Sequence, residues 1–516
     1  MKMDFPFFKI STGSGGVVTS GVPQCTLGHR VQQNPSDVVQ GVFAEWNWDG
    51  TTLTAKVDRL GFCGLFVAEG PDGVSISPSP LQLIAEGAPA TLDDGALGVF
   101  FRIGLFVNDD TPFKHIRVLP PGGTLTWTGG RVTITGGLPE VREVPISRPD
   151  AIEKFAKLLR QGVERCISST DKDLLMPLSG GRDSRHILFN LERLGRLPKK
   201  AITFQPWSDE LGPEATAARE VAERVGVPHV VLNARRSRPR DLVRSFVLSH
   251  FCSDETLMMM ALRDGFCGPD IATLDGIGGD VLSRNKQFSN PEARALYESG
   301  NHTQIAENLI DGHAKAIGAS VEDLFGADEV HRRFPRADAI DRLSSTLQTF
   351  ASFPDPYTAF VFFNRTRREI SLIPHGVMSA TGRVMCPYLD SEVVDFLLSL
   401  PFEVTSGGSF HSDTIAQTYP QYADIPYDSD LPEAESVRSR LSQVRTVLDG
   451  LLVGTMVRPS DFAHNLRNVF QSIPGVMREH QDLYQSYRRY TENLDADRAR
   501  RLIDVATRLD ASATGS

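Results

Sequence analysis

Short apolar runs separated by helical patterns recur through the middle of the chain. Residues 174–178 are Leu-Leu-Met-Pro-Leu, which is typical of a strand buried in a parallel sheet. Similar runs follow at residues 201–204, 228–232 and 270–274, with helical spacing of apolar residues between them, at Ile187, Leu188 and Leu191 and over residues 213–225. This order of strands and helices predicts an α/β domain with a doubly wound parallel sheet and right-handed crossovers.

The first part of the chain has a different pattern. Between residues 41 and 135, short runs of strand-forming residues are separated by Asp-Gly turns at residues 49–50 and 72–73, which predicts an antiparallel β-sandwich. A polar, proline-bearing connector over residues 137–149 follows. We therefore expect one domain over residues 1–140 and a second over residues 141–516. Asp150 is predicted to cap the first helix of the second domain, with Glu153 completing a capping box.

From residue 293 onward the pattern is mostly helical, so helices are expected to be added to the parallel sheet. Two groups of arginines are interpreted as solvated faces, one on a loop at Arg235, Arg236, Arg238 and Arg240 and one on a helix at Arg365, Arg367 and Arg368. The last residues, ending Ala-Ser-Ala-Thr-Gly-Ser, are expected to form a frayed tail.

Composition narrows the class of protein. The 516 residues carry a net charge of −10, which argues against nucleic acid as the main partner. No apolar run approaches the roughly 18 residues that span a bilayer, and residues 1–15 contain no secretory h-region followed by a small-residue cleavage site. The six cysteines are scattered without a CxxC pair, which favours reduced structural thiols in a cytoplasmic protein over a zinc site.

The candidate chemistry begins where the first parallel strand ends. Ser179, Gly180 and Gly181 break the apolar run, and Asp183 and Ser184 open the following helix. Glycines without Cβ let backbone N–H groups approach an anion, the helix dipole favours negative charge, and the serine hydroxyls are further donors. Asp183 is placed to hold a divalent cation that bridges phosphate oxygens. The alternative is an ordinary glycine turn between a strand and a helix.

A second acidic group follows the strand at residues 270–274. There Gly276, Gly278 and Gly279 precede Asp280. Because ligands of such sheets bind beyond the carboxyl ends of the strands, Ser179 and Asp280 are expected at one edge. Asp280 is therefore a second candidate metal ligand, with a simple turn aspartate as the alternative.

These motifs resemble those of a known family. Ser-Gly-Gly-Arg-Asp-Ser at residues 179–184 matches the SGGxDS signature of ATP pyrophosphatases, and the order of motifs along the chain resembles the asparagine synthetase superfamily. The other matching segments are Gly41–Ala44, Asp58–Gly61, Thr111–Phe113, Leu119–Gly122, a Glu210, Glu214, Ala217, Val221, Gly226, His229 pattern, Gly276–Asp280, and Pro387–Asp390 before an apolar helix. The resemblance implies a glutaminase-like N-terminal domain of the Ntn-hydrolase type and a C-terminal ATP-pyrophosphatase domain.

The resemblance also implies site roles. ATP would place its pyrophosphate on Ser179, Gly180, Gly181, Asp183 and Ser184 and its adenine against Phe204 and Gly276. Asp183 and Asp280 would share Mg²⁺, and Arg383 would face the pyrophosphate. For single residues the bland alternatives stay open: Phe204 as core, Arg383 as a structural arginine, Asp390 as a helix cap, and His229 and His411 as structural histidines.

Departures from the family pattern bear on the activity. The family's glutaminases begin with a cysteine whose own α-amine is the base, whereas this chain begins Met1-Lys2-Met3-Asp4 and its first cysteine is Cys25. The N-terminal domain is therefore interpreted as a degenerate scaffold, as in β-lactam synthetases and lasso-peptide cyclases. Ile277 stands where asparagine synthetases carry a glutamate and β-lactam synthetases a tyrosine.

The later motifs depart as well. Arg383 and Met385 alter the family's Glu-x-Arg motif, and no lysine follows Lys315. The family has a catalytic lysine late in its chain, and the candidates for supplying positive charge in its place are Arg438, Arg440 and Arg445. The sequence does not assign this role to one of them.

The expected function is that of an ATP-dependent, AMP-forming amide ligase. It would adenylate a small-molecule or peptide carboxylate and transfer the acyl group to an amine or ammonia, without its own glutaminase and without a membrane or nucleic-acid partner. One form is a lasso-cyclase-like macrolactam synthetase. The alternatives are an ammonia-dependent asparagine synthetase and a nucleotide-binding pseudoenzyme or assembly partner. No motif identifies the substrates or shows whether the product is linear or cyclic. No motif shows the oligomeric state either, and a homo-oligomer is one possibility.

Overall fold

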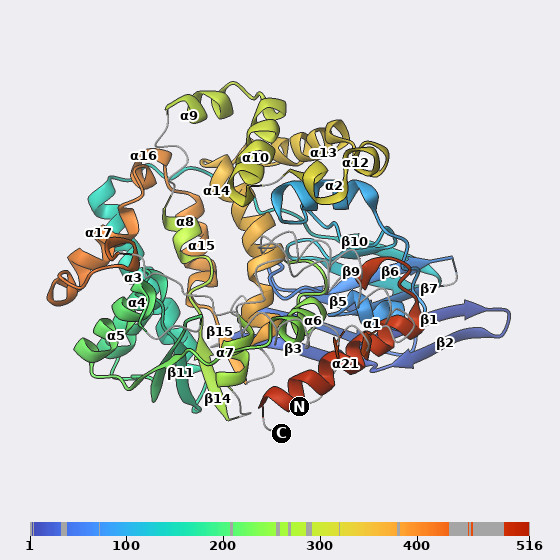
Figure 1. Cartoon of the computed structure of the whole chain (residues 1–516), viewed down its shortest axis with the longest axis horizontal. Helices are drawn as coiled ribbons and strands as arrows, with labels where there is room; N and C mark the ends of the chain where they lie inside the picture. The colour runs from blue at the N-terminus through green and yellow to red at the C-terminus, as the bar shows by residue number, and fades with distance from the viewer. Residues whose placement is uncertain are drawn as a thin grey trace.

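The computed structural model describes residues 3, 5–31, 39–71, 73–206, 210–253, 259–266, 270–284, 291–318, 320–378, 382–432, 452–453, 456–457 and 490–514. Antiparallel sheets lie at the N-terminal end of the chain, and a parallel sheet with helices lies downstream (Figure 1). This arrangement confirms the predicted mixed α/β class, while the Ntn-hydrolase type of the first domain stays a prediction.

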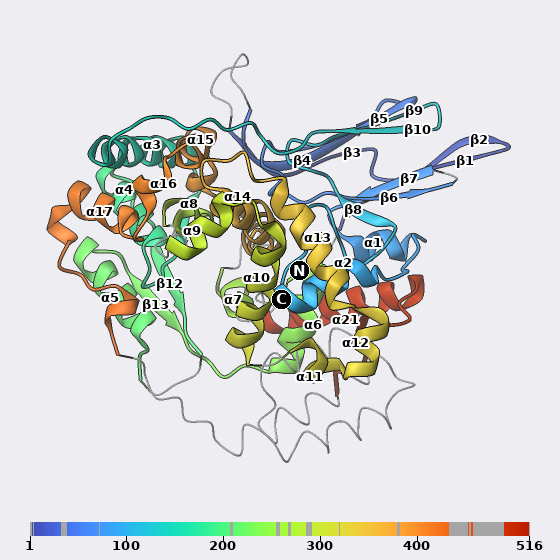
Figure 2. The same cartoon turned by 90° about the horizontal axis from the view of Figure 1, so that it is seen from above.

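Two five-stranded antiparallel sheets form the N-terminal part, in the orders β2-β1-β7-β6-β8 and β10-β9-β5-β4-β3. Figure 2 shows them as two layers, as expected for a sandwich. Alternate residues of β4 and β5 point into the apolar layer between the two sheets, where Trp46 and Leu53 are fully buried. The strands are β1 Phe8–Gly13, β2 Gly16–Gly21, β3 Gln24–Val31, β4 Gln40–Trp48, β5 Thr52–Val57, β6 Phe66–Gly70, β7 Gly73–Ser77, β8 Ile116–Val118, β9 Thr124–Thr128 and β10 Arg131–Thr135.

Two helices interrupt this region and were not predicted. They are α1, Pro80–Ala85, and α2, Asp94–Ile103. Ser79 and Asp93 cap them, each accepting a hydrogen bond from a backbone N–H of the first turn. Both helices are buried over most of their length, so their sequences lack the polar face that marks a surface helix.

The parallel sheet has the strand order β13-β12-β11-β14-β15, and all its neighbours pair in parallel. Its strands are β11 Asp173–Pro177, β12 Lys200–Phe204, β13 His229–Leu232, β14 Ile271–Leu274 and β15 Arg383–Met385. The first four confirm the predicted strands, and β15 was missed because it is three residues long within a helical region. The order reverses between β11 and β14, which is where ligands bind in doubly wound sheets.

Helix α3, Arg148–Ser168, precedes the first strand of this sheet. The helices between successive strands are α4 Asp183–Arg193, α5 Pro213–Val225, α6 Arg238–Leu248 and α7 Met260–Gly265. The N-cap of α3 is Ser147, whose side chain accepts from the N–H of Asp150, so the prediction that Asp150 caps this helix was wrong by one turn. Pro149 explains the difference, since proline is favoured in the first turn of a helix. Residues 136–147 form neither helix nor strand, and the domain boundary at residue 140 stays a prediction.

The remainder is mostly helical, as expected. The elements are α8 Gly279–Ser283, α9 Pro291–Glu298, α10 His302–Ile317, α11 Val321–Phe325, α12 Ala327–Arg333, α13 Arg336–Gln348, α14 Pro356–Val361, the π-helical η3 Phe362–Ile370 and η4 Ile373–Val377, η6 Pro387–Leu389, α15 Ser391–Leu398, α16 Phe402–Thr405, α17 Phe410–Thr418, η7 Pro420–Tyr422, η8 Asp428–Asp430 and α21 Ala496–Thr514. Among the described helices, none has the length and apolar character needed to cross a membrane. The described cysteines, Cys25, Cys63, Cys166, Cys252 and Cys386, carry free thiols, and Cys267 lies outside the described residues.

Arg367 and Arg368 of η3 join the two parts of the protein, which corrects the interpretation of these two arginines as part of a solvated face. Arg367 and Arg368 are only 4% and 5% exposed. Arg367 donates to the carbonyl oxygens of Leu119 at 2.6 Å and Gly61 at 3.2 Å, and Arg368 donates to those of Asn108 and Asp110, each at 2.6 Å. Burial lowers the pKa of Arg367 to about 10. These donors satisfy carbonyls of N-terminal loops that no strand partner reaches.

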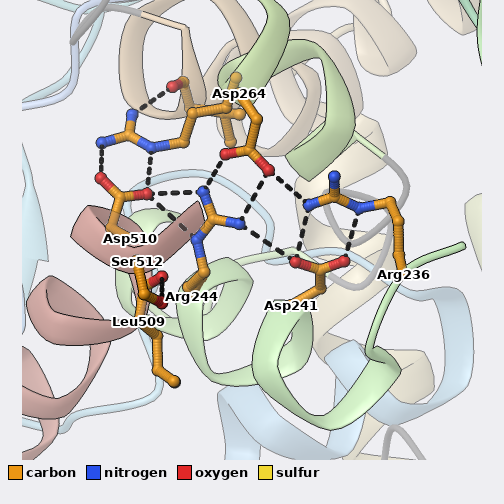
Figure 3. Close-up of polar contacts among 9 residues, drawn as sticks. Arg236, Asp241, Arg244, Asp264, Leu509, Asp510 and Ser512 are labelled. Atoms are coloured by element: carbon orange, nitrogen blue, oxygen red, sulfur yellow. Dashed lines mark hydrogen bonds and ion pairs between the residues drawn. The ribbon is translucent and has the colours of Figure 1, made fainter. Parts of the chain in front are cut away.

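The C-terminal helix α21 is also anchored, so the expected frayed tail is helical up to Thr514. Asp510 accepts from Arg244 at 2.6 Å and from Arg263 at 2.8 Å, and Arg244 also binds Asp264 (Figure 3). Arg236 extends this network through Asp241 and Asp264, each at 2.7 Å, so it is not part of a solvated face. Each guanidinium thereby meets carboxylates that hold α6, α7 and α21 together.

Candidate functional site

The loop between β11 and α4 is closed by its two serines. The N–H of Ser179 donates to Ser184 Oγ at 3.0 Å, the two hydroxyl oxygens lie 3.0 Å apart, and the N–H of Gly181 donates to Ser179 Oγ at 3.3 Å. The loop therefore wraps around the first turn of α4, whose N-terminus carries the positive end of the helix dipole. This is the geometry of an anion site at a helix N-terminus.

Asp183 and Asp280 come together at this edge of the sheet. The N–H of Asp280 donates to Asp183 Oδ2 at 3.1 Å, while Asp183 Oδ1 is buried and accepts no hydrogen bond from the described residues. Burial, followed by the charge of Asp280, raises the pKa of Asp183 to about 8. A Cβ on Gly276 would lie 2.7 Å from Asp183 Cβ, and one on Gly279 would lie 2.6 Å from Asp183 Oδ1. The glycines after β14 are thus needed for this close approach.

These carboxylates fit a magnesium ion that is shared with phosphate. Mg²⁺ is usually bound by one or two carboxylates together with water and phosphate oxygens. Across the described ranges no group of three or more histidine, cysteine or acidic side chains could hold a metal ion, so an all-protein cage is not present there. An unbonded carboxylate oxygen next to a second carboxylate provides two ligands, and the roles of Asp183 and Asp280 as metal ligands stay predictions.

The structure brings together most of the other predicted site residues. Phe204 ends β12 and is partly buried, and Gly276 follows β14, so both lie at the edge that carries the loop. Whether adenine packs on them stays a prediction.

Arg383 is the exception among the predicted site residues. It begins β15 opposite Ala272, near the other end of the sheet, and donates to the carbonyl oxygen of Ser169 at 2.7 Å. Ligands of such sheets bind at the carboxyl ends of the strands, so the start of β15 lies away from that edge. The hydrogen bond to Ser169 favours the alternative of a structural arginine, and a contact of Arg383 with pyrophosphate stays a prediction.

A buried polar chain behind Asp183 was missed by sequence reasoning. His411 Nδ1 lies 2.9 Å from Ser283 Oγ and 3.4 Å from Asp183 Oδ1, and its Nε2 lies 3.1 Å from Tyr388 Oη. His186 Nδ1 is 3.1 Å from the same Nε2. Burial lowers the pKa of both histidines, to about 3 for His186, so both rings are neutral. Tyr388, in the Pro-Tyr-Leu-Asp motif, and His411, as a structural histidine, had been singled out in the sequence, but no pattern placed them behind Asp183.

The other residues singled out in the sequence have structural roles. Asp390 caps α15 and pairs with Arg165 at 2.7 Å, which confirms the cap. His229 Nε2 lies 2.8 Å from Thr203 Oγ1 within the sheet. Ile277 is buried, so its side chain contributes no proton acceptor. Cys25 lies within β3, and burial raises the pKa of its thiol. Arg438, Arg440 and Arg445 lie outside the described residues.

A segment from the C-terminal part covers the anion loop. Arg185 is buried and donates to the carbonyl oxygens of Ile425 at 2.9 Å and Pro426 at 2.7 Å. The N–H of Asp428 donates to the carbonyl oxygen of Gly180 at 3.2 Å. The ring of Tyr427 has the guanidinium carbons of Arg185 and Arg182 at 4.1 and 4.3 Å from its centroid. The loop that follows β11 is therefore enclosed by residues about 250 positions later in the chain, as Arg182 and Asp428 illustrate.

Comparison with known proteins agrees with this geometry. Residues 154–264 match the sequence profile of the asparagine synthase family, which supports a relation to the asparagine synthetase superfamily. The match indicates an ATP-dependent amidation ligase, and enzymes of that family use ATP, generally with Mg²⁺. A search of curated proteins finds no match to this chain.

A similar solved structure is glutamine phosphoribosylpyrophosphate (PRPP) amidotransferase from B. subtilis, complexed with ADP and GMP. The identity is 13% over 47% of this chain and 44% of that chain, with a TM-score of 0.14. The chain thus spans less than half the length of that protein, and a likeness at this score carries no argument about function.

Proposed function

We propose that the protein is an AMP-forming amide ligase. The observation that carries this proposal is the anion loop at the N-terminus of α4, with Asp183 and Asp280 brought together at the point where the strand order reverses. A site of this kind takes a polyphosphate rather than a single carboxylate, because a helix N-terminus and a metal-binding pair of acids act on the same anion.

The chemistry follows from the chain's own groups. The backbone N–H groups of the loop and the hydroxyls of Ser179 and Ser184 hold the β and γ phosphates. A substrate carboxylate oxygen then attacks the α-phosphorus, and pyrophosphate leaves with the bonding electron pair. When bound, Mg²⁺ would cancel negative charge on the leaving pyrophosphate, with Asp183 and Asp280 holding it. An amine nitrogen next attacks the acyl carbon, AMP leaves, and the amine proton passes to solvent.

Positioning and electrostatics can carry most of this rate without a dedicated base. Ile277 cannot accept a proton, so the amine must reach the site already neutral or lose its proton to water. This favours a ligase whose two substrates are held side by side. A macrolactam synthetase, in which one peptide supplies both the carboxylate and the amine, meets this requirement. The genes next to its own would identify the substrate, and a cytoplasmic location and a homo-oligomer are further proposals.

Product analysis tests the reaction class. With ATP, Mg²⁺ and the carboxylate suggested by neighbouring genes, the protein should release AMP and pyrophosphate in equal amounts, measured by chromatography of the nucleotides. A reaction without the carboxylate is the control. Formation of ADP and phosphate would contradict adenylation. ATP binding with no turnover of any carboxylate would instead support a pseudoenzyme.

The glutamine prediction addresses the N-terminal domain. Because Cys25 lies inside β3 and burial raises the pKa of its thiol, it has neither the free α-amine nor the thiolate character of the family's nucleophile. We expect no release of glutamate from glutamine by the protein, with or without ATP, in a coupled glutamate assay. ATP-stimulated glutamate release that disappears in Cys25→Ala would show that the domain is an active glutaminase.

A further inference from the structure

Arg182 stands at the variable position of the Ser-Gly-Gly-Arg-Asp-Ser loop, between Gly181 and the candidate metal ligand Asp183. It is the N-cap residue of α4, but its side chain forms no capping hydrogen bond. Its Nε is buried and has no hydrogen-bond partner among the residues that the structure describes. A guanidinium keeps its charge at any physiological pH, so this group is a fixed cation at the mouth of the anion loop.

The neighbouring arginines differ from Arg182 in one respect. Arg185 is occupied by carbonyl oxygens of the covering segment, and Arg284 pairs with Asp280 at 3.3 Å. The side chain of Arg182 forms no ion pair or hydrogen bond with any residue in the part of the chain that the structure describes, and its guanidinium lies against the ring of Tyr427. Burying part of an unpaired cation costs free energy, so an anion that completes its hydrogen bonds would be strongly favoured there.

Tyr427 holds this cation in place. The ring lies within 4.3 Å of both guanidinium carbons, and its own backbone N–H donates to Asp430 at 3.0 Å. A guanidinium that rests on a fixed aromatic ring has lost much of its rotational freedom before a ligand arrives, which reduces the entropy lost on binding. Arg182 is thus preorganised beside the N–H groups that close around an anion.

The negative charge of the site would be compensated by a cationic side chain such as that of Arg182. Asp183, Asp275 and Asp280 place three carboxylates near the loop, and no lysine follows Lys315 in the sequence. A bound triphosphate would add further negative charge. A cation from within the loop could compensate for the lysine that the family carries late in its chain.

We propose that Arg182 binds the β and γ phosphates of the nucleotide and the pyrophosphate that leaves, supplying from the loop the positive charge that the family takes from its late lysine. This rests on the proposed function, because it assigns a role within the same site. It also identifies the anion that the loop prefers: a pyrophosphate group rather than the single phosphate of AMP.

Isothermal titration with inorganic pyrophosphate, ATP and AMP, each with Mg²⁺, tests the assignment in the full-length protein. Arg182→Gln removes the charge but keeps a planar group that can lie on Tyr427. We expect it to weaken pyrophosphate and ATP binding by about tenfold to a hundredfold, because a hydrogen bond to a charged group is lost. AMP binding should change by less than about threefold, since AMP has no β or γ phosphate. Arg182→Lys should retain part of the affinity, and Arg142→Gln, at an exposed connector position, should match the parent.

Melting temperature separates this role from a structural one. If Arg182 only anchors Tyr427, Arg182→Gln should lower the melting temperature and weaken AMP and pyrophosphate equally, which would overturn the proposal. Unchanged pyrophosphate affinity, or a parent that binds no pyrophosphate, would also overturn it. If Arg182→Gln selectively weakens pyrophosphate binding but the parent protein converts ATP to ADP, the phosphate-binding role of Arg182 is supported and the proposed ligase function is wrong. If the parent protein forms AMP and Arg182→Gln forms AMP at the same rate, the ligase function is supported and the proposed role of Arg182 is wrong.

Discussion

Asp183→Asn and Asp280→Asn should each reduce the rate of AMP formation by on the order of a hundredfold or more, while the protein stays folded. Asparagine keeps the shape of the side chain but removes one negative ligand from the pair that faces the phosphates. The N–H of Asp280 can still donate to the amide oxygen at position 183, so the loop geometry is retained. Single-turnover AMP formation at saturating ATP measures the effect directly.

The stability of these variants tests the same assignment independently. The pKa of Asp183 is raised in the folded protein to about 8, from its ordinary value of 3.8, by burial and by the charge of Asp280. A raised carboxylate pKa means that the folded state binds a proton more tightly than the unfolded state, so the parent loses stability as pH rises from 3.8 towards 8. Without Mg²⁺, Asp183→Asn should therefore melt at or above the parent temperature near pH 7, and the difference should shrink as pH falls.

Asp171→Asn is the matched control, because Asp171 is exposed and precedes β11 at the opposite end of the strand. It should leave both the rate and the melting temperature unchanged. If Asp280→Asn unfolds the protein, or leaves AMP formation intact, Asp280 is a turn residue and the metal site is wrong.

Arg367→Met should have the largest effect on stability. The substitution removes the donors to the carbonyl oxygens of Gly61 and Leu119 and leaves them buried against the other half of the protein. Each unsatisfied buried carbonyl costs about 1–3 kcal/mol, and breaking a buried charged network costs about 3–5 kcal/mol. We therefore expect a loss of about 3 kcal/mol or more, seen as a lower melting temperature and as faster proteolysis between the two parts.

Arg365→Met is the matched control, two residues earlier on the same π-helical segment. Its side chain is 40% exposed and its ion pair with Glu369 is long, at 3.8 Å. Losing such a pair should change the free energy of unfolding by less than about 1 kcal/mol. Equal effects of the two substitutions would show that Arg367 does not connect the N-terminal loops to η3.

The local parts of the site followed from the sequence. The apolar run before Ser179, the glycines and the helical spacing after Asp183 predicted a strand, a turn and a helix N-terminus, and β11 and α4 have these places. The strand before Gly276 was found in the same way, because short-range pattern is set by backbone preferences and burial of one segment at a time. The order of four strands then implied a common edge for Ser179 and Asp280, since parallel strands point their carboxyl ends the same way.

The groups that act between distant segments were decided by the tertiary structure alone. Arg365, Arg367 and Arg368 are the same residue type within one short segment. Arg367 and Arg368 are buried and donate to carbonyls of N-terminal loops, whereas the side chain of Arg365 is 40% exposed. Arg383 was assigned from a motif position, whereas the structure gives it a place at the start of β15 and a hydrogen bond to the carbonyl oxygen of Ser169. The neutral His411 beneath Asp183, and Tyr427 against Arg182, come from segments more than 200 residues later. Sequence pattern reports which residues are buried, but charge compensation depends on which buried groups become neighbours, and only the folded chain determines that.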